Sequence, residues 1–217
     1  MINWDQFDTV LLDMDGTLLD LSFDNFFWRE HLPLEYSRQS NIPIEQARLF
    51  LEELSTSLFG SLNWYCIDHW SEVLQIDIEA IKHELREHIR YRPHSLDFLK
   101  FLRVQNKRSI LVTNAHPKAL ELKIANLDLK SHLDKLVSSH EFGLAKENAG
   151  FWHQLKLRED LDLSRCLFID DSKTVLARAH TEGVGQVLQI LHPDTTQAPN
   201  LHGEFPAIHD FDELMPE

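Results

Sequence analysis

Asp13 and Asp15, two aspartates separated by one residue, directly follow the apolar run Thr9–Leu12. Side chains two positions apart in an extended chain point to the same side, so these carboxylates would lie close together and repel each other. A bound cation or a reacting group would offset that repulsion. One carboxylate can attack an electrophile while its neighbour transfers protons. The pair therefore predicts a reactive site at the end of the first strand.

Other polar residues follow further apolar runs along the chain. Gly16 permits a sharp turn or a close approach of the backbone, and Thr17 adds a hydroxyl. The remaining polar residues, each placed after a predicted strand, are Thr113, Asn114, Lys146, Asp170 and Asp171. If the strands are parallel, their carboxyl ends share one edge of the sheet, where ligands bind in such folds. The sequence then places carboxylates, small polar side chains and a lysine on one rim.

This rim suits a hard metal ion and a phosphate. Closely packed carboxylates need a cation, and oxygen ligands without cysteine or a histidine pair select Mg²⁺ over Zn²⁺. The cation and Lys146 together could hold a phosphate dianion. One aspartate could then attack phosphorus and form an aspartyl-phosphate, while the second protonates the leaving oxygen and later takes a proton from water.

Alternating strand-like and helix-like segments would position these residues. Short apolar runs predict strands at Thr9–Leu12, Ser109–Val112, Lys135–Val137, Cys166–Ile169, Gln186–Leu191 and near Ala207 and Ile208. Helical spacing of apolar residues recurs between them, at Lys118–Leu127 and Thr174–Glu182. The alternation predicts an α/β fold with a doubly wound, mostly parallel sheet.

Residues 21–92 show helical patterns and no clear strand. Ile44–Leu58 and Asp77–Arg90 carry apolar residues at helical spacing, and large aromatic rings are frequent in this segment. We therefore predict a helical cap at residues 21–92, inserted into an α/β core that is formed by residues 1–20 and 93–217.

Charge and composition exclude several classes of partner. The 217 residues carry 21 Lys and Arg against 35 Asp and Glu, a formal charge of -14 that repels nucleic acid polymers and anionic membranes. A small phosphate would bind only beside local cations. Cys66 and Cys166 indicate no disulfide framework and are interpreted as small buried side chains. Without a recognisable signal sequence or membrane span, we expect a cytoplasmic protein, and we infer no protein partner.

Four short motifs carry a resemblance to a known family. DMDGT, LVTNA, GLAKE and FIDDS resemble, in order, the four motifs of the haloacid dehalogenase (HAD) superfamily. The resemblance implies that Asp13 is the nucleophile and a Mg²⁺ ligand, and that Asp15 is the acid/base and binds Mg²⁺ through its carbonyl. It also implies that Asp170 ligates Mg²⁺. Members that dehalogenate lack the second carboxylate, so Asp15 favours phosphoryl transfer.

The same resemblance assigns the rest of the rim. Thr113 would bond the phosphoryl oxygens, Lys146 would neutralise them, and Asp171 would assist the metal directly or through water. The residues expected to line or support the phosphate site are Gly16, Thr17 and Asn114. The helical insertion resembles a C1-type cap, which closes over the site and selects the substrate.

Segments of the cap and rim resemble a narrower group. DNFFW, LNWYC, HWSE, NAHP and SSHEFG are similar to segments of the bacterial GMP/IMP 5′-nucleotidase group. This similarity implies a purine nucleoside monophosphate as substrate, whose base could stack on an aromatic ring for about 1–3 kcal/mol. Asn63, Arg29 or Arg38 could donate to the purine O6. The candidate substrate-binding residues are Trp28, Asn63, Trp64 and Tyr65.

Several cap side chains also have structural interpretations. Phe26, Phe50 and Phe59 at helical spacing indicate core residues rather than contacts to a base. Trp64 and Tyr65 are adjacent, so at most one of them should contact a ligand from a helix. Apart from one loop histidine near the rim, the histidines show no metal-ligand spacing and are interpreted as surface or hydrogen-bonded core residues.

Other functions stay open at this point. The same chemistry fits a phosphatase that acts on sugar phosphates or phosphoglycolate, and a phosphomutase would use the same residues but retain the phosphoryl group. A nucleotide-binding regulator on an inactive scaffold, or a protein that interacts through its acidic surface, fits less well because every catalytic position is filled. We therefore predict a Mg²⁺-dependent phosphomonoesterase that acts on purine nucleoside monophosphates.

Overall fold

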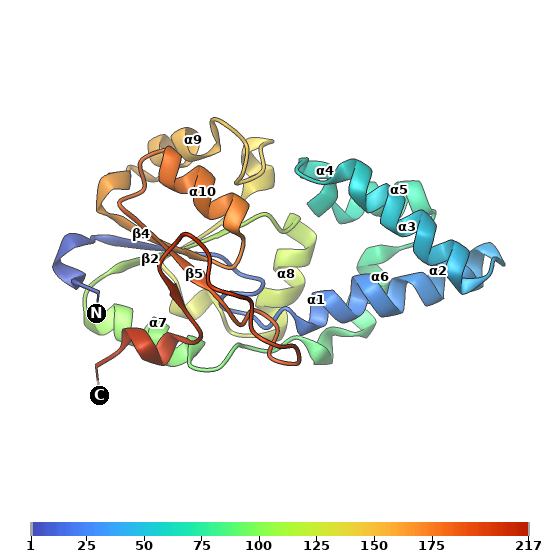
Figure 1. Ribbon diagram of the computed structural model, residues 1–217, viewed down its shortest axis with the longest axis horizontal. Coiled ribbons are helices and arrows are strands. Elements are labelled where there is room, and N and C mark those ends of the chain that lie inside the picture. Colours follow the sequence, from blue (N-terminus) through green and yellow to red (C-terminus); the bar gives the residue numbers. More distant parts are fainter. Residues whose placement is uncertain (1, 217) are drawn as a thin grey trace.

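A six-stranded parallel sheet forms the centre of the protein, whose computed structural model describes residues 2–216 (Figure 1). The strands are β1 (Thr9–Leu12), β2 (Arg108–Thr113), β3 (Lys135–Ser138), β4 (Cys166–Asp170), β5 (Gln186–Ile190) and β6 (Ala207–Ile208). Their order is β3-β2-β1-β4-β5-β6, and each neighbouring pair is parallel. The predicted strands and the predicted α/β class are confirmed.

Helices cover both faces of this sheet. They are α7 (Ser95–Val104), α8 (Pro117–Asn126), α9 (Phe151–Glu159) and α10 (Lys173–Thr181). Val10 and Leu12 of β1 pack in one apolar cluster with residues of α7 and α8, whereas Leu11 packs in a second cluster with residues of α9 and α10. Successive side chains of a strand point to opposite faces, so a continuous apolar run is what a strand buried on both sides requires.

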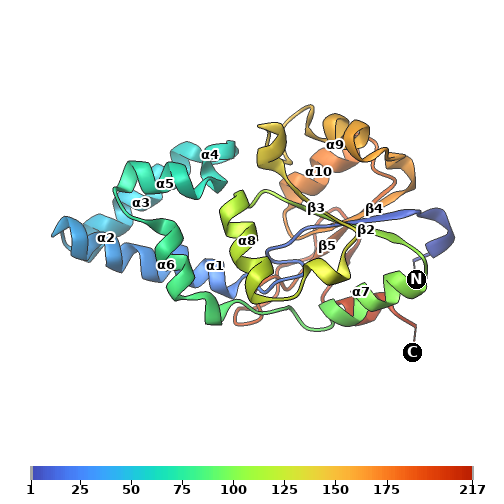
Figure 2. The same ribbon diagram turned by 180° about the vertical axis from the view of Figure 1, so that it is seen from behind.

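A group of helices lies beside the sheet, next to α8 (Figures 1 and 2). They are α1 (Ser22–Phe26), a π-helical turn (Phe27–His31), α2 (Leu32–Ser40), α3 (Ile44–Leu58), α4 (Leu62–Tyr65), α5 (Ile67–Leu74) and α6 (Ile78–Glu84). Phe27 and Trp70 belong to an apolar cluster of their own, which Ala119 of α8 joins. We call this helical group the cap. Its packing shows a separate small core that touches the sheet's helices through α8.

Short 3-10 helices complete the connections. They lie at Trp4–Gln6, Arg86–His88, Lys130–His132, Ser139–Phe142, Leu163–Arg165 and Phe211–Leu214. Within residues 2–216, no helix is long and apolar enough to cross a membrane.

The predicted helix at Asp77–Arg90 is wrong in its second half. The α-helix ends at Glu84, and Leu85 leaves the helical conformation with φ −95° and ψ 6°. After the 3-10 turn at Arg86–His88 the chain becomes extended at Ile89 and returns to the core, where the Asp20 N–H donates to the Arg90 carbonyl over 3.0 Å. Apolar spacing continues through this return because Ile89 is buried against the core. The sequence pattern therefore does not mark the end of the helix.

The prediction that Phe26, Phe50 and Phe59 are core residues is also wrong. Their exposed fractions are 40%, 39% and 69%. The cap helices form a thin layer, so a side chain that faces away from the cap's own cluster has no second layer to cover it. Helical spacing places apolar residues on one side of a helix, but it does not show that another element packs there.

Arg92 ties the returning chain to the core. Its buried guanidinium donates to the carbonyls of Thr17 (3.2 Å), His192 (3.0 Å) and His209 (2.7 Å). These three carbonyls come from segments far apart in the sequence. One side chain therefore fixes the loop after β1, the end of the cap and the C-terminal region relative to one another.

We expect Arg92→Met to lower the free energy of unfolding by at least about 3 kcal/mol, because each buried acceptor left without a donor costs about 1–3 kcal/mol. Urea denaturation followed by circular dichroism measures this difference. Arg103→Met is the matched control, since Arg103 is exposed and donates to one carbonyl, that of Ser131. Equal losses in the two variants would contradict the proposed importance of the three-carbonyl contact.

Candidate active site

Two neighbouring central strands end in aspartates. Asp13 directly follows β1, and Asp170 is the last residue of β4, which pairs with β1. The connection after β1 runs to one face of the sheet and the connection after β4 runs to the other face. In open α/β sheets, ligands bind at the carboxyl ends of two neighbouring strands whose connections diverge in this way. Thr113, the last residue of β2, lies on the other side of β1. The sheet thus gathers the predicted residues on one rim.

Lys146 is the charged centre of this rim. Although it is only 2% exposed, its Nζ contacts Asp13 Oδ1, Asp170 Oδ2 at 2.7 Å and the Val112 carbonyl at 3.1 Å. Burial alone would lower the pKa of Lys146, but the charges of Asp13 and Asp170 raise this pKa above its usual value. Lys146 therefore stays charged, and it is a buried ion-pair partner rather than a surface lysine.

Side chains from two elements hold the backbone of Lys146 in place. The Asn114 Oδ1 accepts from the Lys146 N–H over 2.9 Å, and the indole N–H of buried Trp152 donates to the Lys146 carbonyl over 2.8 Å. The Asn114 amide also donates to Glu147 Oε2 over 2.9 Å. Asn114 thus positions the backbone of Lys146, which is a supporting role at the predicted phosphate site.

Three carboxylates on the rim could share a metal ion. One oxygen each of Asp13, Asp170 and Asp171 lie within 4.8 Å of one another. Burial raises the pKa of Asp13 to about 6, and burial together with the charges of Asp170 and Asp13 raises the pKa of Asp171 well above its usual value. A cation would relieve this repulsion, and a donor set made only of oxygens fits Mg²⁺. The residues present therefore fit the predicted ion.

Asp15 is not part of this carboxylate group, and its side chain pairs with Lys123. Lys123, on α8, is 2% exposed, and its Nζ lies 2.6 Å from Asp15 Oδ1 and 2.6 Å from Asp24 Oδ2. Asp24, on α1, also pairs with buried Lys82 of α6 at 2.8 Å. Burial raises the pKa of Asp15 to about 6, with Lys123 opposing the shift and Asp24 adding to it. A chain of ion pairs thus connects the predicted acid/base to the cap.

The loop after β1 explains the glycine that follows the aspartate pair. Gly16 has φ +86°, and a Cβ built on it would lie 2.7 Å from Asp171 Oδ2. Any side chain here would collide with a predicted metal-site residue, so glycine is required. Thr17 is fully buried below this loop, and its hydroxyl has no hydrogen-bond partner within the described part of the chain. Both residues support the rim from beneath.

A cavity of about 820 Å³ opens between the rim and the cap. Its aromatic lining comes from Trp28, Phe59, Trp64, Tyr65 and Trp70. Trp64 and Tyr65 both line the cavity, with ring centroids 4.7 Å apart in an edge-to-face arrangement, so the prediction that only one of them would face the ligand is not supported by the geometry. α4 is a single turn, and both adjacent rings reach the same wide opening.

Two of the three predicted donors to the purine lie elsewhere. Asn63 is exposed and outside the cavity lining, because a residue next to Trp64 on this single turn is rotated by about 100° towards solvent. Arg38 has a side chain 75% exposed and pairs with Glu35 at 2.6 Å. Arg29 does line the cavity. Of the three candidates, only Arg29 is placed to reach a bound base.

Sequence reasoning missed four polar residues of this region. They are Asp24, Lys82, Lys123 and Glu147. Glu147 directly follows Lys146 within the GLAKE motif, and it accepts from the cap residue Tyr65 over 2.9 Å, so its place in the motif was a usable signal. Asp24, Lys82 and Lys123 come together only in the folded protein. Their spacing in the sequence does not indicate that they are in contact.

We expect Lys123→Met to lower the free energy of unfolding by about 3–5 kcal/mol near pH 8, because the largely buried carboxylate of Asp15 loses its cation and that of Asp24 keeps only Lys82. Without Lys123 the pKa values of Asp15 and Asp24 rise in the folded state, so the folded protein takes up protons as the pH falls. The loss should therefore shrink towards pH 5. Urea denaturation at several pH values measures it.

Lys118→Met serves as the control for this prediction. Lys118 lies on the same helix, but its side chain is 44% exposed and pairs with Asp68 and Glu79 on the surface. We expect a change below about 1 kcal/mol for this variant. A Lys123 variant as stable as the Lys118 variant at pH 8 would show that the ion-pair chain is not important for folding.

Comparisons with known proteins agree with this geometry. The sequence model of the haloacid dehalogenase-like hydrolases matches residues 7–177. A protein named GMP/IMP nucleotidase YrfG, from Escherichia coli (strain K12), is 39% identical over 215 residues, which are 99% of this chain and 97% of that protein. A protein of the same name from Shigella flexneri matches equally well.

Solved structures show the same fold. A HAD phosphatase from Thermococcus onnurineus matches with a TM-score of 0.78 and 19% identity, covering 96% of each chain. The L-2-haloacid dehalogenase from Xanthobacter autotrophicus matches with a TM-score of 0.59 and 14% identity, covering 86% of this chain and 78% of that chain. From the match over residues 7–177 and the nearly full-length relative, we conclude that this chain belongs to the haloacid dehalogenase-like hydrolase family.

Proposed function

We propose that this chain is a Mg²⁺-dependent phosphomonoesterase that hydrolyses purine nucleoside 5′-monophosphates, GMP and IMP first, to a nucleoside and phosphate. The observation that carries the proposal is the placement of Asp13, Asp15 and Lys146 at the floor of an aromatic cavity of about 820 Å³. The relative named GMP/IMP nucleotidase, 39% identical over nearly the whole chain, supports the choice of substrate.

Asp13 and Asp15 would divide the chemistry between them. A carboxylate oxygen of Asp13 attacks phosphorus, and a new P–O bond forms while the bond to the nucleoside oxygen breaks. Asp15 gives its proton to that leaving oxygen. In the second step Asp15, now a carboxylate, takes a proton from water, which attacks the aspartyl-phosphate and releases phosphate from Asp13. A pKa of about 6 lets Asp15 change its protonation state near neutral pH.

The other rim residues would manage the charge of the phosphate. Lys146 neutralises negative charge that develops on the phosphoryl oxygens, and the Thr113 hydroxyl, which already accepts from the Ala115 N–H over 3.0 Å, can donate to one of them. Asp13, Asp170 and Asp171 would hold Mg²⁺, with the Asp15 carbonyl. When bound there, Mg²⁺ would polarise the phosphoryl group as a Lewis acid. These local cations matter because the chain as a whole carries a formal charge of -14.

The cavity would hold the nucleoside. Its volume lies in the range of about 300–1,000 Å³ that is usual for small-molecule sites. Trp28, Trp64 and Tyr65 present rings to it, and Arg29 brings a guanidinium. A guanidinium can donate two hydrogen bonds to the O6 and N7 of a 6-oxo purine, whereas the 6-amino group of adenine offers a donor instead of an acceptor. This contrast gives a physical reason to expect GMP and IMP before AMP.

The test of this proposal is phosphate release from a panel of nucleoside monophosphates, sugar phosphates and phosphoglycolate, with and without Mg²⁺. We expect release to require Mg²⁺ and to be fastest, as kcat/KM, for GMP and IMP. Asp13→Asn should abolish turnover, because an amide is a poor nucleophile and a poor Mg²⁺ ligand. A preference for sugar phosphates would overturn the purine assignment, and full activity of Asp13→Asn would overturn the mechanism.

We expect Trp64→Ala to lower kcat/KM for GMP about 5- to 150-fold, the equivalent of about 1–3 kcal/mol of lost stacking. The same variant should leave hydrolysis of p-nitrophenyl phosphate nearly unchanged, since that substrate has no purine. Phe50→Ala is the control, because Phe50 is an exposed cap ring that stacks on Tyr36 outside the cavity. An equal loss for both substrates would mean that Trp64 only supports the cap, where its indole donates to Ser55.

A further inference from the structure

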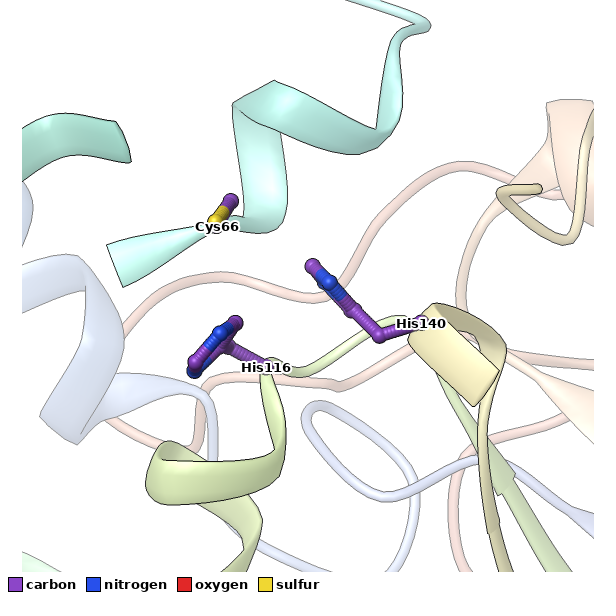
Figure 3. A group of neighbouring side chains, drawn as sticks. All are labelled: Cys66, His116 and His140. Atoms are coloured by element: carbon purple, nitrogen blue, oxygen red, sulfur yellow. The ribbon is translucent and has the colours of Figure 1, made fainter. Parts of the chain in front are cut away.

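Cys66, His116 and His140 converge where the cap meets the core (Figure 3). Cys66 lies between α4 and α5 of the cap, His116 is the N-cap residue of α8, and His140 lies in the 3-10 helix after β3. One ligand atom of each residue lies within 4.8 Å of the other two. The sequence predicted Cys66 to be a small buried side chain, but it is only partly buried. Three separate segments meet here, so no spacing in the sequence indicated the cluster.

His140 presents a nitrogen that lacks a partner. Its Nε2 is buried and has no hydrogen bond to any atom of residues 2–216, so only part of the ring is satisfied as the prediction of a hydrogen-bonded core histidine requires. The ring also makes a hydrogen bond with the Asn114 backbone. Burial and the neighbouring His116 lower the pKa of His140 to about 4. A buried nitrogen without a partner destabilises the fold, and a metal ion would satisfy it.

His116 is placed to share the same ligand. The two histidine rings meet edge to face, with centroids 4.9 Å apart and an interplanar angle of 85°. Asp68 of the cap helix α5 lies with Oδ2 3.7 Å from His116 Nε2. Figure 3 shows the His140 ring pointing towards the Cys66 side chain, with the His116 ring beside it. The arrangement resembles a ligand cluster more than a packed apolar contact, because polar atoms face one another.

We propose that Cys66, His116 and His140 form a zinc site that joins the cap to the core. A thiolate with two imidazole nitrogens is a borderline-soft donor set that favours Zn²⁺ over the hard ion Mg²⁺. Zinc binds the thiolate, so the Cys66 thiol releases its proton to solvent on binding. Three protein ligands leave a fourth tetrahedral position for water. This set shares no residue with the carboxylates of the rim.

The proposed ion would act as a clamp. Zinc lies about 2.3 Å from sulfur and about 2.0–2.1 Å from nitrogen, so its ligand atoms are about 3.5 Å apart. Cys66 moves with the cap, whereas both histidines belong to the core. Occupancy therefore fixes the cap against the core, next to the cavity that His116 lines. We expect bound zinc to slow any turnover that requires the cap to open. Zinc binding itself does not depend on the identity of the substrate.

Cobalt and zinc titrations of the full chain test the site. The protein is first treated with a chelator and then kept in excess Mg²⁺, so that the rim carboxylates are supplied with their own ion. Co²⁺, used as a coloured substitute for Zn²⁺, should give a near-ultraviolet band from sulfur-to-metal charge transfer at one ion per chain. Competition with a chromophoric chelator should show that Cys66→Ser weakens Zn²⁺ binding by at least about 10- to 100-fold.

Matched variants make the result decisive. Cys166→Ser removes the other cysteine, which is buried in the core at 1% exposure, and should keep both the band and the affinity. Cys66→Ser should lose the band, and His140→Gln should weaken binding even if Cys66→Ser folds poorly, as checked by circular dichroism. A band that persists in Cys66→Ser, or zinc bound with no sulfur band in the unaltered protein, would overturn the site.

Turnover of p-nitrophenyl phosphate in excess Mg²⁺ tests the clamp. Zinc at one equivalent should slow the unaltered protein and Cys166→Ser, but it should leave the rate of Cys66→Ser unchanged. Equal inhibition of all three would place the inhibiting zinc elsewhere and overturn the clamp. The binding titrations contain no substrate. Their result therefore tests the zinc site even if the proposed purine specificity is wrong.

Discussion

The ion pairs of buried Lys146 with Asp13 and Asp170 are the contacts on which the rim depends. Strand ends bring several carboxylates together in a chain that already carries an excess of negative charge. A buried carboxylate without a cation takes up a proton and ceases to be a nucleophile or a metal ligand. Lys146 opposes the rise in pKa that burial causes in Asp13 and Asp170, and Asn114 and Trp152 keep Lys146 in place through its backbone. The charge of these two carboxylates therefore depends on how the fold positions one lysine.

Several polar contacts join the cap to this rim, beside the apolar contacts of Phe23 and Ala119. Lys123 pairs with Asp24 of α1, the Tyr65 hydroxyl donates to Glu147, and Lys118 pairs with Asp68 of α5. Water can replace hydrogen bonds and ion pairs more easily than it can replace an apolar interface, so relative movement of cap and core is expected. A cap that opens admits substrate, and a cap that closes excludes water from the phosphoryl group. The polar interface thus matches the needs of the proposed reaction.

Elements that depend on one local signal in the sequence were predicted correctly. β1 has the predicted bounds Thr9–Leu12, and the other strands were located to within their ends, because a buried parallel strand is a continuous apolar run. The residues of the rim were predicted because they directly follow the predicted strands. Side-chain positions that depend on a distant contact were not predicted. The exposed ring of Phe59 and the outward position of Asn63 reflect a cap with no second layer, and Lys123 meets Asp15 only across the fold.

The fold is shared with a dehalogenase, and in the reaction proposed above Asp15 would be the residue that favours phosphate hydrolysis over loss of a halide. A halide leaves as a stable anion and needs no proton, whereas the alkoxide of a nucleoside is a poor leaving group unless a proton reaches it as the bond breaks. A carboxyl group can supply that proton near neutral pH only if its pKa is raised, and burial raises the pKa of Asp15 to about 6. Lys123 limits that rise, so Asp15 can also lose the proton and serve as the base for water. In the proposed reaction the lysine on α8 would therefore set the balance between the two steps, and its contact with Asp24 would tie that balance to the position of the cap.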